Sequence, residues 1–328
     1  MKPNADVTTD RTAYYEPLVY KVPAEDDGVL LRTIIQRRLG VSRKLLSRLK
    51  LTERGIMLNG ARVYINVQVS QGDTVELRME REQSEDILPQ PMELHILYED
   101  EHLLVLAKPS GIIVHPTHGH YTGTIANGVV HHWLERGEEV RFRPIHRLDQ
   151  ETSGVLAIAK TAYVHQNISE QMQQGLVEKE YAAFVYGVLS ADAGTVNAPI
   201  DRNPASPHER IVMPEGEGYP SVTHYRVLRR YAHATLVALR LETGRTHQIR
   251  VHMKHLGHPL IGDKLYVPAQ QPVPPEWEAL DKLADRHALH AVRLAFAHPM
   301  TKEYMSFTAP LPEDLARLEQ RLEAGSCT

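Results

Sequence analysis

The sequence predicts an α+β fold in two parts, a small α+β domain followed by a larger domain built on a mixed, largely antiparallel sheet. The chain has 328 residues, which is enough for one large domain plus a small one. From His95 onward, strand patterns alternate with helices and hairpin signals. We expect a loose tail at residues 1–15, a small domain at 16–80, a linker at 81–92 and the large domain at 93–328.

Two short helices and a hairpin sheet are predicted within the small domain. The first helix is indicated by apolar residues at helical spacing, namely Leu30, Leu31, Ile34, Ile35 and Leu39. Gly40 is suited to end this helix, and Ser42 to begin a second one that carries Leu45, Leu46 and Leu49. Asn59 and Gly60 then favour a hairpin turn, and residues 69–77 close the sheet with a second turn and strand.

Charge is spread unevenly along the chain, although the net charge is only −4. Residues 32–62 are strongly basic and contain Glu53 as their one acid, whereas residues 76–101 are mostly acidic. Such a run is often a solvated helix face, but a local basic face can also release counterions from RNA whatever the net charge is. We therefore expect Arg43, Lys44 and Arg48 to contact RNA.

The larger domain begins after a charged linker that ends in Pro89 and Pro91. A helix is predicted at residues 161–174, behind a buried strand that precedes it. Residues 267–275 are proline-rich and indicate a loop, and residues 313–324 indicate a terminal helix.

Composition excludes several classes of protein. The single cysteine, Cys327, allows neither an internal disulfide nor a thiolate zinc cluster. The sequence contains no secretory segment and no apolar run long enough to span a bilayer, so we expect a cytoplasmic protein without membrane contact. Residues 262–264 lack the Ser or Thr that a phosphate-binding loop needs after its lysine. No cofactor is expected, and we expect a monomer.

One turn carries an unusual group of polar side chains. Residues 146–154 place His146, Arg147 and Asp149 directly before the apolar run 155–159, which predicts a buried strand. A carboxylate at such a place is costly to desolvate unless it is paired. On its own, this turn would more often be structural, with Asp149 and Thr152 as turn caps.

Two further segments favour a chemical role for the turn. Residues 241–255 contain Gly244, which allows a tight turn, and Thr246, which is suited to cap a following helix. Arg245 would project from that corner toward a carboxylate. Residues 177–187 predict a strand with Tyr181 near its entrance, where an aromatic residue alone is ordinary.

Together these segments resemble the RluA/RluD-type pseudouridine synthases. Residues 146–154 are similar to that family's catalytic motif, 179–181 to its tyrosine motif and 244–252 to its arginine motif. Residues 106–116, 261–266 and 288–291 also match, all in family order from about Leu94 to the C-terminus. The small domain resembles an RNA-binding domain named after a ribosomal small-subunit protein. It departs from the usual pattern at residues 29–31, where an Arg-Leu-Asp start is common.

The resemblance implies an isomerase that converts uridine in RNA to pseudouridine. Asp149 would be the catalytic residue, which stabilises or attacks the electron-poor sugar carbon or removes a neighbouring proton; these three routes remain open. Arg245 would pair with Asp149 and orient it. Tyr181 would stack on the uracil and accept the proton lost from its carbon 5. Leu265 or Ile261 would form an apolar wall beside the base.

RNA contacts are implied for several other residues. The target base must be flipped out of the RNA, and Arg147 is similar to the family residue that fills the vacated stack. His146 is expected beside it as a substrate contact, and Lys108, Lys160 and Arg250 as contacts to the RNA backbone. A lysine is common where Tyr219 stands, so a phosphate contact is not expected there.

Other functions remain alternatives. His115, His118 and His120 invite a metal hypothesis, but Pro116 and Gly119 interrupt any regular register, and we predict no metal. The two-part layout favours large-subunit ribosomal RNA as substrate by analogy alone. The alternatives are a related synthase that acts on transfer RNA, a non-catalytic RNA-binding or ribosome-associated protein and, more distantly, a metal-dependent hydrolase.

Overall fold

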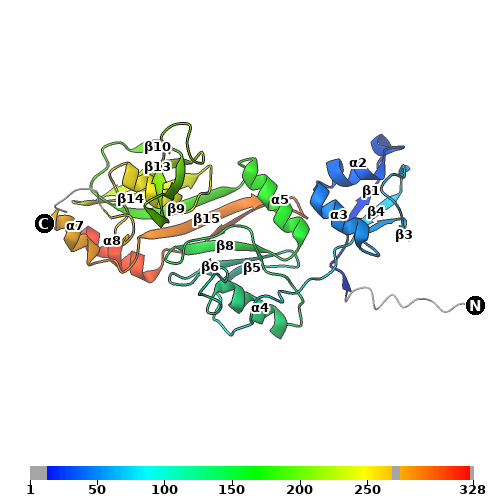
Figure 1. The fold of residues 1–328 in the computed structure, drawn as a ribbon, viewed down its shortest axis with the longest axis horizontal. Coiled ribbons are helices and arrows are strands. Elements are labelled where there is room, and N and C mark those ends of the chain that lie inside the picture. The colour runs from blue at the N-terminus through cyan, green and yellow to red at the C-terminus, as the bar shows by residue number, and fades with distance from the viewer. Residues whose placement is uncertain (1–12, 268–273, 326–328) are drawn as a thin grey trace, which may run out of the picture.

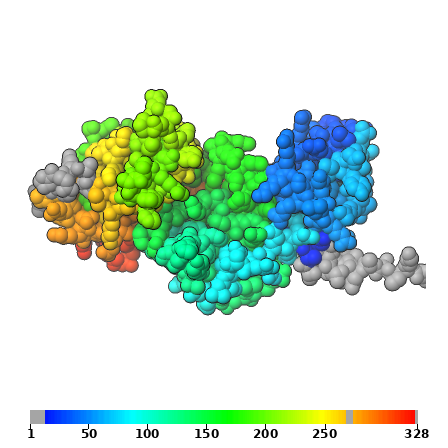
Figure 2. All heavy atoms as spheres, in the orientation of Figure 1, coloured from blue at the N-terminus to red at the C-terminus, as the bar shows by residue number. Residues whose placement is uncertain are grey.

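The computed structural model describes residues 13–267 and 274–325, and shows a small N-terminal unit beside a larger one (Figure 1). Most of the predicted tail, part of the predicted proline-rich loop and Cys327 lie outside the described residues. In the space-filling view the small unit sits against the side of the larger unit that carries helix α5 (Ala162–Gln173) (Figure 2).

The small unit is a four-stranded antiparallel sheet with short helices. Its strands follow the order β1-β4-β2-β3, and their bounds are β1 (Leu18–Lys21), β2 (Ile56–Leu58), β3 (Ala61–Arg62) and β4 (Thr74–Leu77). A 3₁₀ turn (Ala24–Asp26) precedes helix α2 (Leu31–Thr33), a π-helical turn (Ile34–Arg38) and helix α3 (Arg43–Leu51).

Several of these elements are stabilised by the local interactions that the sequence predicted. Ser42 caps α3, because its side chain accepts a hydrogen bond from the Leu45 N–H. Asn59 and Gly60 have φ values of 51° and 77°, the left-handed conformations that a two-residue hairpin turn requires. The first helix differs from prediction in one respect. The Leu39 N–H reaches back to the Ile34 carbonyl, so the helix widens into a π turn before Gly40.

The larger unit is organised around a ten-stranded mixed sheet, which confirms the predicted α+β class. The main path runs β10-β13-β14-β9-β15-β8-β6-β5, with β16 paired to β15 and β7 paired to β8. Among the strand pairings of the described residues, only β15–β8 is parallel. The strands are β5 (Ile96–Glu99), β6 (Leu103–Lys108), β7 (Arg143–Pro144), β8 (Ser153–Ala159), β9 (Glu178–Tyr186), β10 (Ala193–Asn197), β13 (Val222–Arg230), β14 (Ala234–Leu241), β15 (Leu289–Ala297) and β16 (Tyr304–Thr308).

A separate hairpin of β11 (Ile200–Asn203) and β12 (Ser206–Val212) stands outside this sheet. The helices of the larger unit are α4 (Ile125–Glu135), α5, α6 (Gln248–His255), α7 (Pro275–Asp281) and α8 (Glu313–Gly325).

Strand β8 is a continuous apolar run because both of its faces are buried. Val155 and Ala157 pack into the cluster on the α5 side, and Leu156 and Ile158 into the cluster that contains α4.

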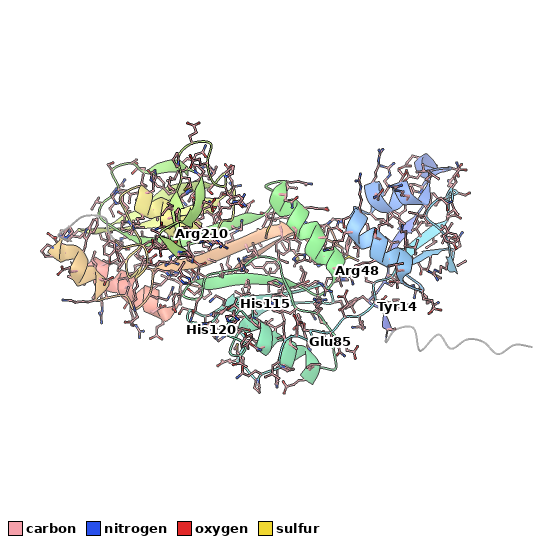
Figure 3. All side chains as sticks on the ribbon, in the orientation of Figure 1. Tyr14, Arg48, Glu85, His115, His120 and Arg210 are labelled. Carbon is pink, nitrogen blue, oxygen red and sulfur yellow. The ribbon has the colours of Figure 1, made fainter. Side chains whose placement is uncertain are left out.

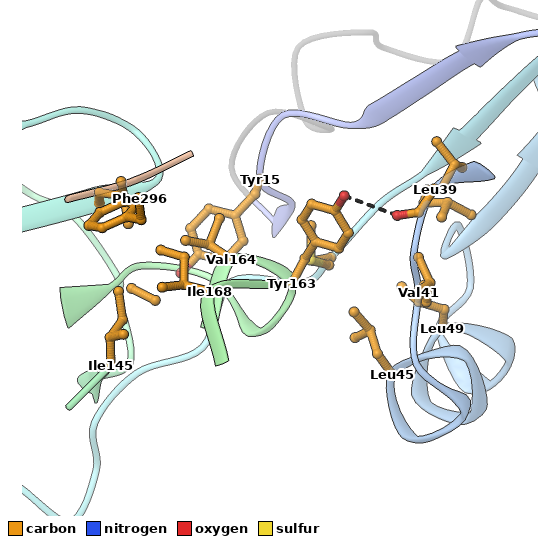
Figure 4. Packing of buried hydrophobic residues seen from close by; sticks show 14 of the residues in the cluster. Tyr15, Leu39, Val41, Leu45, Leu49, Ile145, Tyr163, Val164, Ile168 and Phe296 are labelled. Carbon is orange, nitrogen blue, oxygen red and sulfur yellow. Dashed lines mark hydrogen bonds between the residues drawn. The ribbon is translucent and has the colours of Figure 1, made fainter. Parts of the chain in front are cut away.

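The small unit and the larger unit share one apolar cluster (Figure 4). Leu39, Val41 and Leu45 of the small unit belong to the same buried cluster as Tyr163 and Ile168 of α5. The Tyr163 hydroxyl donates to the Leu39 carbonyl at 3.0 Å, across the boundary between the units. The contact therefore joins apolar burial with a directed hydrogen bond.

The connection between the units is also packed. Tyr15, which we assigned to the tail, is buried in the shared cluster. In the segment assigned to the linker, Glu82 pairs with Arg48 of α3 and with Arg143 of β7, and Ile87 is buried against the α4 side of the sheet. These contacts fix the chain path between the small sheet and the large one.

Candidate active site

Asp149 lies on the turn that precedes β8, at the edge where β8, β15 and β9 meet. Ala291 of β15 pairs with Gly154 of β8 on one side and with Tyr181 of β9 on the other. Gly154 has a φ of 119°, and a Cβ there would stand 2.1 Å from the Ala291 carbonyl oxygen. Only glycine allows this close approach, which brings the Asp149 turn and Tyr181 to the same part of the sheet.

Arg250 provides the guanidinium beside Asp149. Its Nη1 lies 3.4 Å from Asp149 Oδ2, while Nε and Nη2 donate to the two carboxylate oxygens of Asp263 at 2.7 and 2.8 Å. Burial alone would raise the pKa of Asp263, but the hydrogen bonds and charge of Arg250 outweigh burial and lower it. Arg250 is thus fixed by one buried carboxylate and presented to a second, partly exposed one.

The predicted pairing of Arg245 with Asp149 is wrong. The Arg245 Nε donates to the Pro220 carbonyl, and its guanidinium lies over the ring of Tyr219, 5.7 Å from the centroid. Arg250 was expected to contact the RNA backbone, but it is largely buried in ion pairs instead. Two arginines five positions apart share one segment, and the sequence alone did not show which faced inward.

The corner before α6 also differs from prediction. Helix α6 begins at Gln248 and is not capped by Thr246; its N-cap is His247, with φ of 58° and no side-chain cap bond. The buried Gln248 supports the corner instead, since its Oε1 accepts from the Arg245 N–H and its Nε2 donates to the Val222 carbonyl. This later helix start places Arg250 in the first turn, directed at the site.

His247 is a further side chain near Asp149, and the sequence analysis gave it no role at the site. Its Nε2 lies 3.9 Å from Asp149 Oδ2, and its Nδ1 lies 2.8 Å from the hydroxyl of Tyr266. Burial lowers the pKa of His247, against the opposing effect of the Asp149 charge, so the neutral ring is favoured. No sequence signal could have found it, because the left-handed φ of 58° at this helix start is seen only in the structure.

Tyr181 is buried in β9, near Asp149. Burial raises the pKa of its phenol, and the negative charge of Asp149 raises it further. Leu265, one of the two predicted wall residues, is partly buried against the cluster of Tyr266 and Val251. Ile261 is fully buried in a different cluster with Phe184. It therefore cannot form the predicted apolar wall beside the base.

Arg147 and His146 are neighbours in the chain but lie in different environments, one exposed and one partly buried. Arg147 is exposed, next to the buried Leu148, which anchors the turn. His146 was predicted as a substrate contact, but its Nε2 accepts from the Ala157 N–H at 3.4 Å. Burial lowers the pKa of His146 to about 3, so the ring is neutral. His146 therefore holds the turn against β8, and its Nδ1 has no hydrogen-bond partner among the described residues, so the predicted substrate contact stays a prediction.

Two predicted contacts to the RNA backbone are corrected because the lysines are buried. Lys108 is 1% exposed, and its Nζ donates to the carbonyls of Pro109, Ile112 and Gln150. Lys160 is paired with Glu99 and Glu138. An ammonium enclosed in this way has no surface to offer a phosphate. Lys108 instead ties β6 to the residue that follows Asp149.

The basic residues of α3 also separate into two kinds. Arg43 and Lys44 are exposed near its start. Arg48, labelled in Figure 3, pairs with Glu82. A pairing with the connecting segment gives Arg48 a structural role beside any contact with RNA.

No group of three or more His, Cys, Asp or Glu side chains that could hold a metal is present among residues 13–267 and 274–325. Within these same ranges, no helix is long and apolar enough to cross a membrane.

Comparisons with known proteins agree on one family. Residues 102–255 match the family model described as RNA pseudouridylate synthase. A Bacillus subtilis protein, the uncharacterized RNA pseudouridine synthase YjbO, is 42% identical over 281 residues, covering 85% of this chain and 95% of that protein. The ribosomal large subunit pseudouridine synthase D of Pasteurella multocida is 38% identical over 286 residues, covering 85% and 87%.

A solved structure extends the similarity to the fold. The human RNA pseudouridylate synthase domain containing 1 matches with a TM-score of 0.53 and 26% identity, over 72% of this chain and 98% of that one.

Proposed function

This chain belongs to the RluA/RluD-type family of RNA pseudouridine synthases, and from that we propose that it isomerises uridine in large-subunit ribosomal RNA with Asp149 as the catalytic residue. In this reaction the bond from sugar C1′ to N1 of uracil breaks and a bond from C1′ to C5 forms. The proton on C5 is lost and N1 gains one, so no oxidant and no energy donor is consumed.

The observation that carries the proposal is the surroundings of the Asp149 carboxylate. Arg250 and His247 face Asp149, and Tyr181 lies near it in β9. As the glycosidic bond breaks, positive charge develops at C1′, and a fixed carboxylate stabilises or attacks that carbon. Arg250 orients the carboxylate without neutralising it fully, because its other two nitrogens are bonded to Asp263.

The electrostatic effect of Asp149 on Tyr181 suggests an order for the proton transfers. Burial raises the pKa of Tyr181 and the charge of Asp149 raises it further, so the phenol keeps its proton while the carboxylate is free. If Asp149 becomes an ester to the sugar or the base, its charge disappears and the phenol becomes more acidic. Tyr181 could then give its proton to N1 of the released uracil, and the resulting phenolate could accept the C5 proton at the stage where that proton must leave.

The ribosomal RNA substrate is supported by relatives and by the two-part layout. Several relatives at 38–40% identity are named ribosomal large subunit pseudouridine synthase D. Exposed basic residues of the small unit, Arg43 and Lys44 among them, add an RNA-binding face. A cytoplasmic, monomeric enzyme remains our expectation from the sequence.

The test measures tritium release from transcripts labelled at uridine C5. We expect release from large-subunit ribosomal RNA and little from transfer RNA. The Asp149→Asn variant should lose at least about 100-fold in rate while it binds the same RNA. Release from transfer RNA alone would assign the transfer RNA alternative, and RNA binding without release by the unaltered protein would contradict the enzyme proposal.

A further inference from the structure

A groove of about 840 Å³ lies on the small unit, between the end of α3 and the loop after β3. The buried Leu49 and Ile56 form its floor. Tyr64 stands at its edge with 85% of its surface exposed. The open ring beside an apolar floor leaves a flat face on which a base can stack.

The polar groups of the groove favour an anionic partner. Lys50 and Arg62 are exposed and line the groove, Asn66 adds an amide, and no acidic side chain lines it. The Arg62 guanidinium donates to the Lys50 carbonyl, which holds the two cationic residues together. A flat ring, an apolar floor and paired cations are what one nucleotide of a single strand requires.

We propose that this groove binds an unpaired nucleotide of the RNA substrate, with its base stacked on Tyr64 and its phosphate held by Lys50 and Arg62. The inference rests on the proposed function, because that function supplies the RNA. Single-stranded RNA is favoured over a protein partner because every charged residue of the lining is basic.

A tryptophan placed in the groove reports binding directly. Tyr64→Trp should lose fluorescence when the RNA substrate is added, whereas Val19→Trp, on the opposite edge strand of the same sheet, should not. Tyr64→Ala should weaken RNA affinity by about tenfold.

Unchanged affinity in Tyr64→Ala, or quenching by ribosomal proteins but not by naked RNA, would overturn the groove proposal. Pseudouridine formation by the unaltered enzyme is measured on the same RNA, so failure of the proposed function would be seen separately.

A second inference comes from the hydrogen bonds of Tyr266. The Arg210 N–H of β12 donates to the Tyr266 hydroxyl at 2.9 Å, and the same hydroxyl lies 2.8 Å from Nδ1 of His247, to which it can donate its own proton. Burial raises the pKa of Tyr266 to about 12, so the hydroxyl keeps that proton. An Nδ1 that accepts requires the ring proton to sit on Nε2, the nitrogen that faces Asp149.

The geometry points to His247 as a positioning residue for Asp149, held by Tyr266 in the tautomer that presents an N–H to the carboxylate. The left-handed φ of His247 supports this, since such a conformation persists only where the surroundings impose it. Arg210, labelled in Figure 3, lies on the separate β11–β12 hairpin, so the hairpin is joined to the catalytic carboxylate through two side chains. This inference also rests on the proposed function and is independent of the groove.

Four variants test the role of His247. His247→Ala should lower kcat by about tenfold with KM unchanged, and His247→Gln, which keeps an N–H donor, should recover part of the loss. Tyr266→Phe should lower kcat in the same sense. His255→Ala, an exposed position on the same helix, should leave kcat unchanged.

A merely structural role for His247 would lower thermal stability equally in the Ala and Gln variants without recovery of kcat. That result, or a wild-type kcat in His247→Ala, would overturn the inference. Absence of activity in the unaltered enzyme would instead count against the proposed function.

Discussion

Two arginines of one segment could be confused in the sequence, and of these two only Arg250 forms an ion pair with Asp149. Arg250 is held by Asp263 and reaches Asp149, while Arg245 rests over Tyr219 near the surface. We therefore expect loss of Arg250 to affect stability and catalysis far more than loss of Arg245.

Replacing Arg250 by Ala should destabilise the protein by about 3–5 kcal/mol, because Asp263 would remain buried without its partner. It should also lower kcat, since Asp149 would lose its orienting group. Arg245→Ala should change stability by less than about 1 kcal/mol. Denaturant unfolding and single-turnover rates of the two variants provide the measurement, and equal losses from both would contradict the assignment.

Lys108 gives the stability a dependence on pH. Burial lowers the pKa of its ammonium to about 7 from 10.5, so between these values the unfolded state binds more protons than the folded one. The free energy of unfolding should therefore rise from pH 7 toward pH 10.5 by up to a few kcal/mol from this group.

The control is Lys108→Met, which has no ammonium to titrate. Urea midpoints at pH 7 and 9.5 should rise more in the unaltered protein than in Lys108→Met. Parallel changes in the two proteins would show that the ammonium titrates as it would in water.

At the scale of elements, the pairing of β8 with β15 depends on one glycine. A methyl group at Gly154 would meet the Ala291 backbone at 2.1 Å, and the φ of 119° is unfavourable for any side chain. Gly154→Ala should cost more than about 2 kcal/mol and reduce activity, because Asp149 and Tyr181 are brought together by this pairing. Gly175→Ala, with a positive φ and open space around it, should cost only about 1 kcal/mol. Thermal melts of both variants test this, and equal costs would contradict it.

Most elements could be predicted from the sequence because local chemistry determines them. Ser42, Thr161 and the Asn59 turn all act within a few residues of chain, and the structure confirms each. Side-chain direction at the site could not be predicted, because it depends on contacts over long sequence distances. Lys108 turns inward to Gln150, and Arg250 is held by Asp263 in a loop beyond its own helix. The strained start of α6 at His247 has no local sequence signature.

At the scale of the whole molecule, the small unit is fastened to α5 by directed bonds. Gln166 donates from Nε2 to the Gly40 carbonyl at 2.7 Å, and its Oε1 accepts from the Ser42 N–H at 3.0 Å. One side chain therefore bridges the end of the first helix and the start of α3.

Gln166→Ala should loosen this contact by about 1–2 kcal/mol. The connecting segment would open more often, so trypsin should cut faster at Arg81, which now lies over the ring of Tyr15. Gln173→Ala, an exposed position on the same helix, is the matched control. Equal cleavage rates in the two variants would mean that the bridge does not hold the units together.

The shared cluster of Figure 4 also limits how the protein can be shortened. Without residues 1–80, the cluster would lose Leu39, Val41 and Leu45, and the hydroxyl of Tyr163 would lose its acceptor. A truncated enzyme would expose apolar surface along α5. We expect it to aggregate unless polar substitutions were introduced there. Removal of the N-terminal unit should therefore lower the solubility of the protein as well as alter its RNA binding.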